Sequence, residues 1–486
     1  MNRRRALLTL AGSALPAIAV NGWTSIFDGK TLNGWKANRP ASWRVDAGAI
    51  VADGSASHLF YDGPGAAGIE NFELEADVLT RPFANSGIYF HTAYQGSGFP
   101  KQGFEVQVNN TALGEGSYRE RKRTGSLYGI RNVYKQLARD NEWLTLNVRV
   151  SANNIQVRVN GLLTVDYIEP TPPLIPPSQE TARFLQKGGF ALQCHDPGSH
   201  VRFRNLRYRL LPSAPRIPFN ADATDKRIIA LAAKNYPLVD YHVHFHESLG
   251  LPEAMEKSRR GGIYYGLAGN CGRLSRLRSD TEALAFLDSI SGQSAFAGMQ
   301  VEGEDWTRHF TRATCARFDY LFNDAMIWTG AGGLWRRIYR ADDLGAIADP
   351  QAFVEDFTAR IVRTIATQPI DYYANPTYLP PVLEPRRAEL WTEARTARII
   401  DAAARHGVAL ELSDRHRLPG EAFVKRAKAA GCKFVLGTGN GTDSDLRRCE
   451  YSLDLIERCS LSWQDFAILG NHGERAVDRR AHLFPA

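Results

Sequence analysis

The chain has 486 residues, of which 44% are hydrophobic and 23% are charged, as in a soluble globular protein with two or three domains. The net charge of +7 is modest and includes the basic run Arg3 to Arg5, so we expect no nucleic-acid partner. The six cysteines are scattered without a Cys-x-x-Cys pair, which excludes a disulfide framework and a zinc-finger spacing.

The first 20 residues have the pattern of an export signal. The basic head precedes an apolar run that starts at Ala6, and Ala17 to Ala19 fits a cleavage site with small residues. Arg-Arg-x-Leu-Leu at residues 4–8 resembles a twin-arginine signal, and the apolar run is too short to span a membrane. We therefore expect residues 1–20 to be a signal peptide, and the mature protein to be periplasmic or secreted with no membrane span. The alternative is a cytoplasmic protein with an apolar N-terminus.

Residues 21–211 are predicted to be all-β. Apolar and acidic residues alternate from Phe72 to Val78, as in a half-buried strand. Residues 146–150 and 155–159 give two more strands, and Asn160-Gly161 has the composition of a two-residue hairpin turn. Short strands with Gly, Asn and Asp turns and no long helical pattern predict a two-sheet sandwich.

The stretch from Phe104 to Asn109 predicts a strand with one polar face. Its apolar residues alternate with Glu105, Gln107 and Asn109, and alternate side chains of a strand point to opposite faces. An acid beside two amides, with no Lys or Arg between them, is typical of the floor of a sugar-binding groove. An ordinary solvated strand face is the alternative.

Two later strands, at residues 190–195 and 201–210, are expected to extend this polar face. Gln193 and His195 share the polar side of the first strand, and Arg204 belongs to an arginine pair on the second. We expect these side chains to join Glu105 on one groove.

Seven short motifs in this half resemble, in order, the 3-keto-disaccharide hydrolase domain family. They cover roughly residues 22–210 and read WTSIFDGKTLNGWK, NSGIYFH, GFEVQV, GSLYGI, NEWLTLNVRV, VNG and GGFALQCHDPGSHVRFRNLRYR. The resemblance implies a concanavalin-like (jelly-roll) β-sandwich with a concave sheet. It also implies cleavage of 3-keto-glycosides, including 1,2-lyase and 2-hydroxy-glucal hydratase activity.

The implied reaction suits these residue types. A ketone at C3 acidifies the C2 proton, so a base can remove it while the C1 glycosidic oxygen leaves, and water then adds to the glycal. Such a site needs a base, an acid and a stabiliser for the enediolate. We expect Glu105 or His195 to be the base, and Arg204 or a metal to hold the negative charge.

Further side chains are candidates for substrate binding. Tyr128 and His91 are expected to donate protons or bind hydroxyls, and the other candidates are the amides Asn85, Gln107 and Gln193. The structural alternatives are a turn histidine at 195 and a surface ion pair at 204, in which case the domain only binds sugar.

The second half changes character after a Pro-rich linker at residues 212–224. Apolar residues recur at steps of three and four from Leu390 to Ala404, and a helix after Pro419 leads into an apolar strand that ends at Leu436. Alternating helices and strands over residues 225–486 predict a TIM-type α/β barrel, with site residues at the carboxyl ends of its strands.

The strand that ends in His242-Val243-His244 is the strongest motif of this half, because both imidazoles point the same way, as a metal site needs. The segments VDYHVH, GIYYGLAGNCG, IDYYANPTYLP, LELSDRHRLPGEAF and KFVLGTGN resemble the PHP metal-dependent hydrolases. By this resemblance His242 and His244 match the first ligand pair, and Glu302 is the candidate acidic ligand.

This half also departs from the PHP pattern. Asn375 stands where that family usually has a His, and Gly439-Asn440-Gly441 stands where Asp-x-His is usual. We therefore expect at most one divalent metal ion, held by His242, His244 and Glu302. A barrel that has lost catalysis and supports the sandwich is the alternative.

Three functions remain open from the sequence. The first is an exported enzyme that acts on a small-molecule sugar, a 3-keto-glycoside, in the sandwich. The second is a carbohydrate-binding sandwich joined to a hydrolytic barrel. In the third, both domains are non-catalytic binders.

Overall fold

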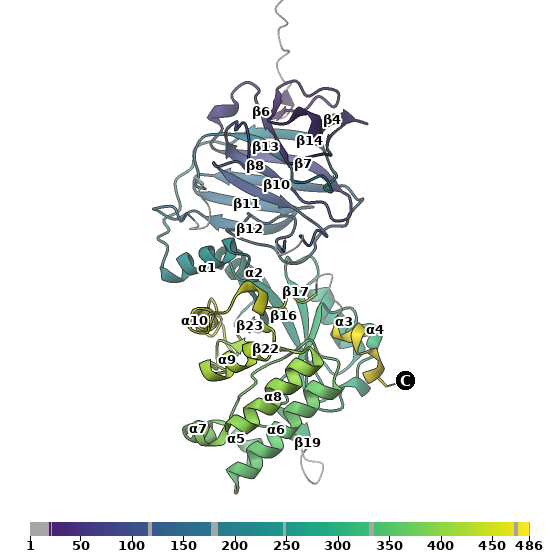
Figure 1. Cartoon of the computed structure of the whole chain (residues 1–486), viewed down its shortest axis with the longest axis vertical. Helices are drawn as coiled ribbons and strands as arrows, with labels where there is room; N and C mark the ends of the chain where they lie inside the picture. The colour runs from purple at the N-terminus through teal and green to yellow at the C-terminus, as the bar shows by residue number, and fades with distance from the viewer. Residues whose placement is uncertain are drawn as a thin grey trace, which may run out of the picture.

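The computed structural model describes residues 19–20, 22–114, 119–175, 183–245, 249–329, 335–470 and 475–485. A β-sandwich lies at one end of the molecule and an α/β barrel at the other (Figure 1). The predicted signal peptide lies outside the described residues except for Ala19–Val20, which pair as β1 with β2. No described helix is long and apolar enough to cross a membrane.

The sandwich consists of two antiparallel sheets. The nine-stranded sheet contains β1 (Ala19–Val20), β2 (Trp23–Ser25), β14 (Val201–Leu210), β7 (Phe72–Thr80), β10 (Leu144–Ser151), β11 (Asn154–Val159) and β12 (Leu162–Ile168), with β4 (Trp43–Asp46) and β5 (Ala49–Ala52) beside them. The five-stranded sheet runs in the order β3 (Trp35–Ala37), β6 (Ser57–Tyr61), β13 (Gly189–Cys194), β8 (Ser86–Thr92) and β9 (Phe104–Val108). The prediction of antiparallel sheets in the N-terminal half is confirmed.

One apolar core lies between the two sheets. Phe72 of the larger sheet lies 5.7 Å from Phe90 and 5.1 Å from Phe190 of the smaller sheet, measured between ring centroids. The apolar residues of β9 belong to the same core. Strand alternation therefore turns Glu105 and Gln107 to the opposite face of the five-stranded sheet.

Seven parallel strands close the barrel, one fewer than the eight of a TIM barrel. They are β15 (Val239–Val243), β16 (Tyr264–Cys271), β17 (Phe296–Val301), β18 (Tyr320–Asn323), β21 (Tyr372–Tyr373), β22 (Ala409–Ser413) and β23 (Phe434–Gly437). The longer helices are α1 (Ala223–Ala233), α2 (Leu251–Gly261), α3 (Asp280–Ser289), α6 (Pro350–Thr367), α8 (Glu393–His406), α9 (Glu421–Ala429) and α10 (Glu450–Arg458). The short elements are α4 (Arg312–Cys315), α5 (Ala341–Leu344), α7 (Arg387–Leu390), α11 (Ala476–Arg479) and the hairpin β19 (Ile327–Thr329) and β20 (Trp335–Arg337).

Helix α8 shows how the local sequence sets these elements. The Thr392 side chain accepts a hydrogen bond from the Arg395 amide and so caps the first turn. The helix ends at Gly407, whose φ of 62° lies in the left-handed region that favours glycine. The predicted apolar series is only partly right. Ile400 lies on the buried face of α8, but Ala394 and Ala404 are exposed, Leu390 belongs to α7, and the buried face also contains Ile399 and Ala403.

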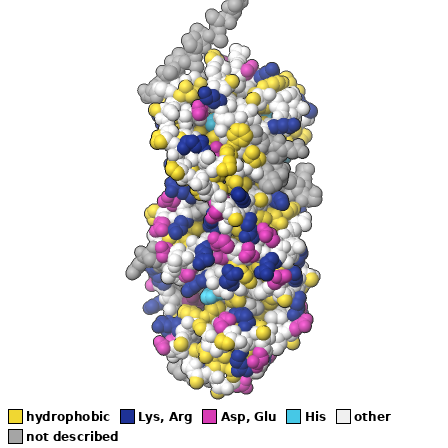
Figure 2. Space-filling view, turned by 90° about the vertical axis from the view of Figure 1, so that its left-hand side faces the viewer, with side chains coloured by type: hydrophobic (Ala, Val, Ile, Leu, Met, Phe, Trp, Pro, Cys, Tyr) yellow, Lys and Arg dark blue, Asp and Glu magenta, His cyan; other side chains and the backbone are white. Residues whose placement is uncertain are grey.

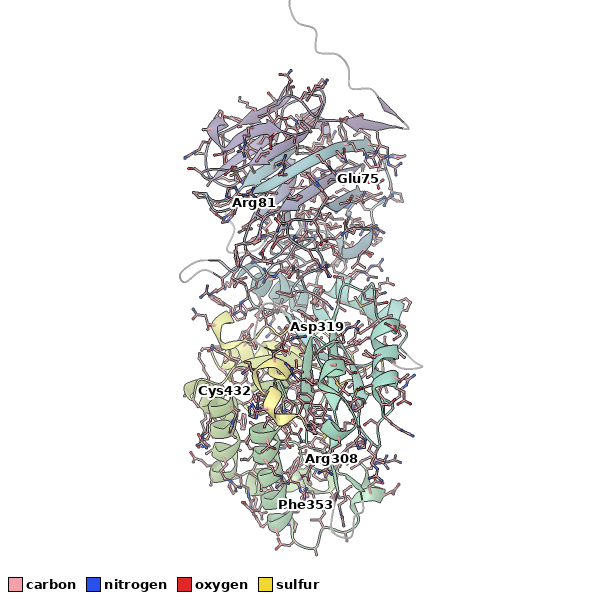
Figure 3. All side chains as sticks on the ribbon, turned by 90° about the vertical axis from the view of Figure 1, so that its right-hand side faces the viewer. Glu75, Arg81, Arg308, Asp319, Phe353 and Cys432 are labelled. Carbon is pink, nitrogen blue, oxygen red and sulfur yellow. The ribbon has the colours of Figure 1, made fainter. Side chains whose placement is uncertain are left out.

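The sandwich packs against the N-terminal end of the barrel. The Tyr134 hydroxyl donates to the Tyr236 carbonyl at 2.9 Å, and its ring lies in a buried cluster with Tyr241 and Phe296 of the barrel. Lys135 forms an ion pair of 2.7 Å with Asp319, which Figure 3 labels at this junction. The two domains therefore share a packed interface.

The segment between the domains, residues 211–222, has no regular secondary structure, and α1 starts at Ala223. The segment is held to the sandwich, because the Ile217 amide donates to the Asn153 side chain at 2.7 Å. On the face of the molecule shown in Figure 2, basic and acidic side chains are interspersed over the barrel.

Candidate functional site

Five polar side chains share the outer face of the five-stranded sheet. Four neighbouring strands supply them, and we call the set the polar face: His58 on β6, Gln193 on β13, Tyr89 on β8, and Glu105 and Gln107 on β9. The strand register places Tyr89 opposite Glu105 and Gly87 opposite Gln107. The structure thus brings together Glu105, Gln107 and Gln193, which the sequence proposed for one groove.

Glu105 lies on β9, the strand at one edge of the polar face. Its carboxylate lies over Gly87, where an added Cβ would stand 2.3 Å from Oε1, so only glycine leaves room for it. The Tyr89 hydroxyl donates to Glu105 and accepts from Gln193 Nε2 at 3.0 Å. Burial raises the pKa of Glu105 above its ordinary value, although Arg183 and the Tyr89 hydrogen bond oppose the shift.

His195 lies at the end of β13, with 27% of its side chain exposed. Its Nδ1 is 2.8 Å from Asp196 Oδ2, so this carboxylate orients the imidazole. Nε2 is the ring nitrogen that Asp196 does not hold. Hydrogen bonds from His195 and Ser199 outweigh burial and lower the pKa of Asp196. His195 also acts electrostatically on Glu105 and on His58, whose pKa burial lowers to about 4.

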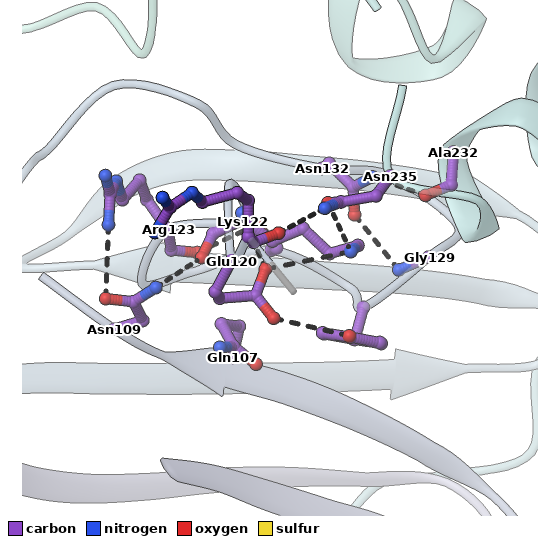
Figure 4. A network of polar contacts seen from close by, with 12 residues as sticks. Gln107, Asn109, Glu120, Lys122, Arg123, Gly129, Asn132, Ala232 and Asn235 are labelled. Atoms are coloured by element: carbon purple, nitrogen blue, oxygen red, sulfur yellow. Dashed lines mark hydrogen bonds and ion pairs between the residues drawn. The ribbon is translucent and has the colours of Figure 1, made fainter. Parts of the chain in front are cut away.

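Three charged residues beside the polar face were not predicted from the sequence. Lys122 is buried, with Nζ 3.7 Å from Glu120 Oε1 and 3.0 Å from Asn235 Oδ1 of the barrel domain (Figure 4). Arg183 donates to the Tyr128 carbonyl at 3.0 Å. Burial lowers the pKa of Lys122, and the carboxylates of Glu120 and Glu105 oppose this shift.

Glu120 and Lys122 were missed because the run RERKR reads as a solvated charged loop. The loop and the residues after it instead lie along the edge of β9 that is not paired with β8. The Tyr128 amide donates to the Glu105 carbonyl, and the Gln107 amide donates to the Ser126 carbonyl, both at 2.9 Å. The signal available in the sequence was the neighbouring motif GSLYGI, whose apolar residues need a core.

The remaining amide and hydroxyl candidates lie beside this cluster. Gln107 Nε2 donates to Asn85 Oδ1 at 2.8 Å, and both side chains are buried. The Tyr128 hydroxyl donates to Glu120 Oε2 at 3.3 Å, and the Tyr128 ring lies 4.4 Å below Lys122 Nζ. Tyr128 therefore connects the backbone of Glu105 to Glu120 of the charged loop, while Asn85 and Gln107 bond to each other.

The placement expected for Arg204 is wrong. Arg204 lies on β14 in the nine-stranded sheet, opposite Asp77, whose Oδ2 is 3.4 Å from its Nε. Its guanidinium stacks on Trp143 at 3.9 Å. Two further ion pairs, Arg207 with Glu75 and Arg209 with Glu73, continue this row of ion pairs on the outside of the sheet. Figure 3 labels Glu75. Arg204 is therefore a surface ion-pair residue, remote from Glu105.

The placement expected for His91 is also wrong. Alternation from Tyr89 puts residue 91 on the polar face, but His91 has a φ of 54°, which interrupts the alternation. Its ring lies 5.5 Å from Phe72, and its Nε2 donates to the Glu70 carbonyl at 2.9 Å. Burial lowers its pKa to about 4, so His91 is a neutral core residue.

A second polar site lies at the mouth of the barrel, a cavity of about 980 Å³ at the carboxyl ends of the strands. Each strand of the barrel or the residues just after it contribute to the lining, which includes His242 and His244 (β15 and after), Asn270 (β16), Gln300 and Glu302 (β17 and after), Asp324 (after β18), Asn375 (after β21), Arg415 (after β22) and Asn440 (after β23). The sandwich closes the other end of the barrel. The cavity at the barrel mouth and the polar face of the sandwich are therefore separated by the barrel.

The donor set at this mouth does not fit the expected metal on His242, His244 and Glu302. His242 Nδ1 lies 2.7 Å from Glu411 Oε1, and Nε2 lies 3.1 Å from Gln300 Oε1, so both ring nitrogens are engaged by protein oxygens. Burial disfavours the charged ring, but Glu411 outweighs burial and raises the pKa of His242. Among the described residues, no group of three or more His, Cys, Asp or Glu side chains is arranged to hold a metal ion.

The neighbouring carboxyl groups belong to the same hydrogen-bond network. Asn270 Nδ2 donates to Glu302 Oε1 at 2.9 Å and to Gln300 Oε1 at 3.0 Å. Gln300 Nε2 in turn donates to Asp324 Oδ2 at 3.2 Å. His244 Nδ1 donates to the Ala268 carbonyl at 2.9 Å. These side chains are thus held by hydrogen bonds to one another and to the backbone.

Comparison with known proteins bears on the sandwich. Residues 22–209 match the model of the 3-keto-alpha-glucoside-1,2-lyase-like domain. Over 82 residues the chain is 37% identical to a 3-keto-disaccharide hydrolase of Bacteroides thetaiotaomicron, an alignment that covers 15% of this chain and 28% of the relative. The chain therefore spans little more than a quarter of that relative's length.

Two solved structures are similar to parts of the chain at low identity. A candidate glycosyl hydrolase of Parabacteroides distasonis is 20% identical, with a TM-score of 0.34, and the match covers 40% of this chain and 95% of that one. Histidinol phosphate phosphatase of Lactococcus lactis is 13% identical, with a TM-score of 0.34, and the match covers 46% of this chain and 94% of that one.

Proposed function

We propose that the sandwich cleaves 3-keto-glycosides on the polar face of its five-stranded sheet. The observation that carries this proposal is the presence of a buried carboxyl, Glu105, near a partly exposed imidazole, His195, whose Nδ1 is held by Asp196. Groups whose surroundings differ in this way suit the acid and the base of one reaction. The family match over residues 22–209 supports the same chemistry.

In this proposal His195 removes the C2 proton. Its Nδ1 is fixed by Asp196, so Nε2 takes the proton and the carboxylate stabilises the imidazolium that forms. The C2–H bond breaks, and its electrons form the C2–C3 double bond of the enediolate, with the negative charge on the C3 oxygen. The C3 carbonyl then forms again, the electrons move to the C1–C2 bond, and the C1–oxygen bond breaks. Partial exposure of His195 lets a sugar reach it from solvent.

Glu105 is the proposed acid that protonates the departing glycosidic oxygen. Burial raises its pKa, so the carboxyl holds a proton to a higher pH than an ordinary glutamic acid. Lys122 and Arg183, in place of Arg204, supply the positive charge that steadies the enediolate oxygen. Addition of water across the glycal then returns a hydrogen to C2 and places a hydroxyl on C1, which gives net hydrolysis.

The fold assignments belong to the same proposal. We assign the sandwich as concanavalin-like and the barrel as PHP-like, on the motifs that each half carries. The metal-dependent hydrolase expected of such a barrel has no support from the hydrogen bonds of His242. A sandwich that only binds sugar remains the second candidate, because Gln193 and Asn85 suit hydroxyl recognition equally well.

The test is turnover of a 3-keto-glucoside in deuterium oxide. We expect the full-length protein to release 3-keto-glucose with deuterium at C2, because the proton lost from C2 exchanges with solvent before water adds. The parent glucoside without the ketone should not react, since its C2 proton is not acidic. Release of product without deuterium at C2 would show direct hydrolysis, and no release would leave only sugar binding.

We also propose that residues 1–20 export the protein. Fused to a reporter, they should direct it to the periplasm, and Arg4→Lys with Arg5→Lys should reduce export if the twin-arginine resemblance holds. Cell fractionation measures the outcome. Unchanged export of the double variant would assign the signal to the general secretory route, and a reporter that stays in the cytoplasm would refute export.

A further inference from the structure

The cavity at the barrel mouth plays no part in the reaction proposed for the sandwich. Its volume of about 980 Å³ is in the range of small-molecule sites, and a polar side chain from each strand or from the segment just after it lines the cavity. A ligand site at the carboxyl ends of the strands is the usual arrangement in α/β barrels.

The floor of the cavity is a row of hydrogen-bonding groups fixed by one another. Gln300 lies between His242 on one side and Asp324 on the other, and Asn270 joins it to Glu302. Gln300 is only 5% exposed, so its orientation is set before any ligand arrives. A floor of this kind offers donors and acceptors at fixed positions, as hydroxyl groups of a ligand require.

The walls of the cavity are largely apolar and aromatic. They include Phe245, Phe286, Met326, Tyr339 and Tyr378. Tyr378 packs edge-on against His416, with ring centroids 5.1 Å apart, which holds its ring in place. Aromatic rings beside fixed amides suit a ligand that has both C–H faces and hydroxyl groups.

The charges argue against a phosphate or carboxylate ligand. Two carboxyl groups, Glu302 and Asp324, lie on the floor, and the described lining contains no Lys. Arg415 is already engaged by Asp445 at 3.4 Å and by the Gly439 carbonyl at 3.1 Å. Arg276 is at the exposed rim. His242 Nδ1 is already engaged by Glu411 at 2.7 Å. An anion would therefore meet carboxylates where it needs cations.

We propose that the barrel mouth is a metal-free binding pocket for an uncharged sugar. The amides of Asn270 and Gln300 bind its hydroxyl groups, and the aromatic walls pack against its C–H faces. This pocket is separate from the polar face of the sandwich, so its function stands or falls independently of 3-keto-glycoside cleavage.

Isothermal titration of the full-length protein with glucose, sucrose and glucose 6-phosphate tests the proposal. Ala285→Trp places a bulky ring in the cavity from an exposed position of α3, and Asn270→Ala removes a floor amide. We expect each to weaken binding of the neutral sugar at least about tenfold, since a lost polar contact of about 1.4 kcal/mol corresponds to that factor. Thr281→Trp on the same helix, outside the lining, is the matched control and should bind as the wild type does.

Further controls separate the two sites and the metal. Glu105→Gln, on the sandwich, should keep the binding of neutral sugar at the barrel mouth. Elemental analysis of the wild type and of His242→Ala should give the same metal content. The proposal is overturned if the neutral sugars do not bind at concentrations up to about 10 mM. It is also overturned if both pocket variants bind as the wild type does, if glucose 6-phosphate binds more tightly than glucose, or if a metal is lost with His242.

Discussion

Glu105→Gln should lower kcat for a 3-keto-glucoside by about 10²–10⁴-fold, the range over which a positioned general acid or base contributes. Glutamine keeps the size of the side chain but cannot give up a proton to the glycosidic oxygen. The neighbouring amides should then retain sugar affinity, so KM should change little. Steady-state kinetics with circular dichroism as a check on folding measures both.

The pH profile should identify Glu105 as the acid. Because burial raises its pKa, the carboxyl is protonated below that raised value and ionised above it, so kcat/KM should fall as the pH rises through it. Glu105→Gln should remove this alkaline limb along with most of the activity. A limb that persists unchanged in the variant would assign it to another group.

Two control variants make the prediction sharper. Gly87→Ala adds a methyl group 2.3 Å from Glu105 Oε1 and should displace the carboxylate, with a large loss of kcat and an intact charge. Arg204→Ala, on the opposite sheet, should leave kcat nearly unchanged. Full activity of Glu105→Gln, or loss of activity in Arg204→Ala, would contradict the proposed site.

The residues of this site show what the sequence can and cannot predict. Alternation alone placed Glu105 and Gln107 opposite the core, because the period of a strand is a local property. The same rule failed at His91, where a single residue with positive φ turns the side chain into the core. Arg204 failed for another reason, since the sheet that a strand joins depends on contacts distant in sequence.

Burial of charge was the least predictable feature. Lys122 lies in a run of charged residues in the loop beside β9. It is nevertheless buried, and its ammonium group donates to Asn235 of the barrel. In the barrel, the strand end that presents His242 and His244 was predictable from the pattern. Its hydrogen-bond partners Gln300 and Glu411 lie 58 and 169 residues away, so the surroundings of the ring could not be predicted from the local pattern.

Tyr134→Ala should produce the largest loss of stability that we predict. Tyr134 is 2% exposed and fills the N-terminal end of the barrel, in a cluster with Val239, Tyr264 and Phe296. Removal of a buried aromatic ring typically lowers the free energy of unfolding by about 3–5 kcal/mol, because contacts are lost and a cavity remains. Calorimetry of the full-length protein should show the barrel transition at a lower temperature.

Tyr134→Phe separates the ring from its hydroxyl. The hydroxyl donates to the Tyr236 carbonyl at 2.9 Å and accepts from the Leu238 amide at 3.2 Å, so its loss leaves two backbone groups unpaired. We expect a smaller loss of about 1–3 kcal/mol. Tyr94→Ala, at a side chain that is 47% exposed on the sandwich, should change the barrel transition little. If Tyr134→Ala also leaves that transition unchanged, the sandwich does not stabilise the barrel through this residue.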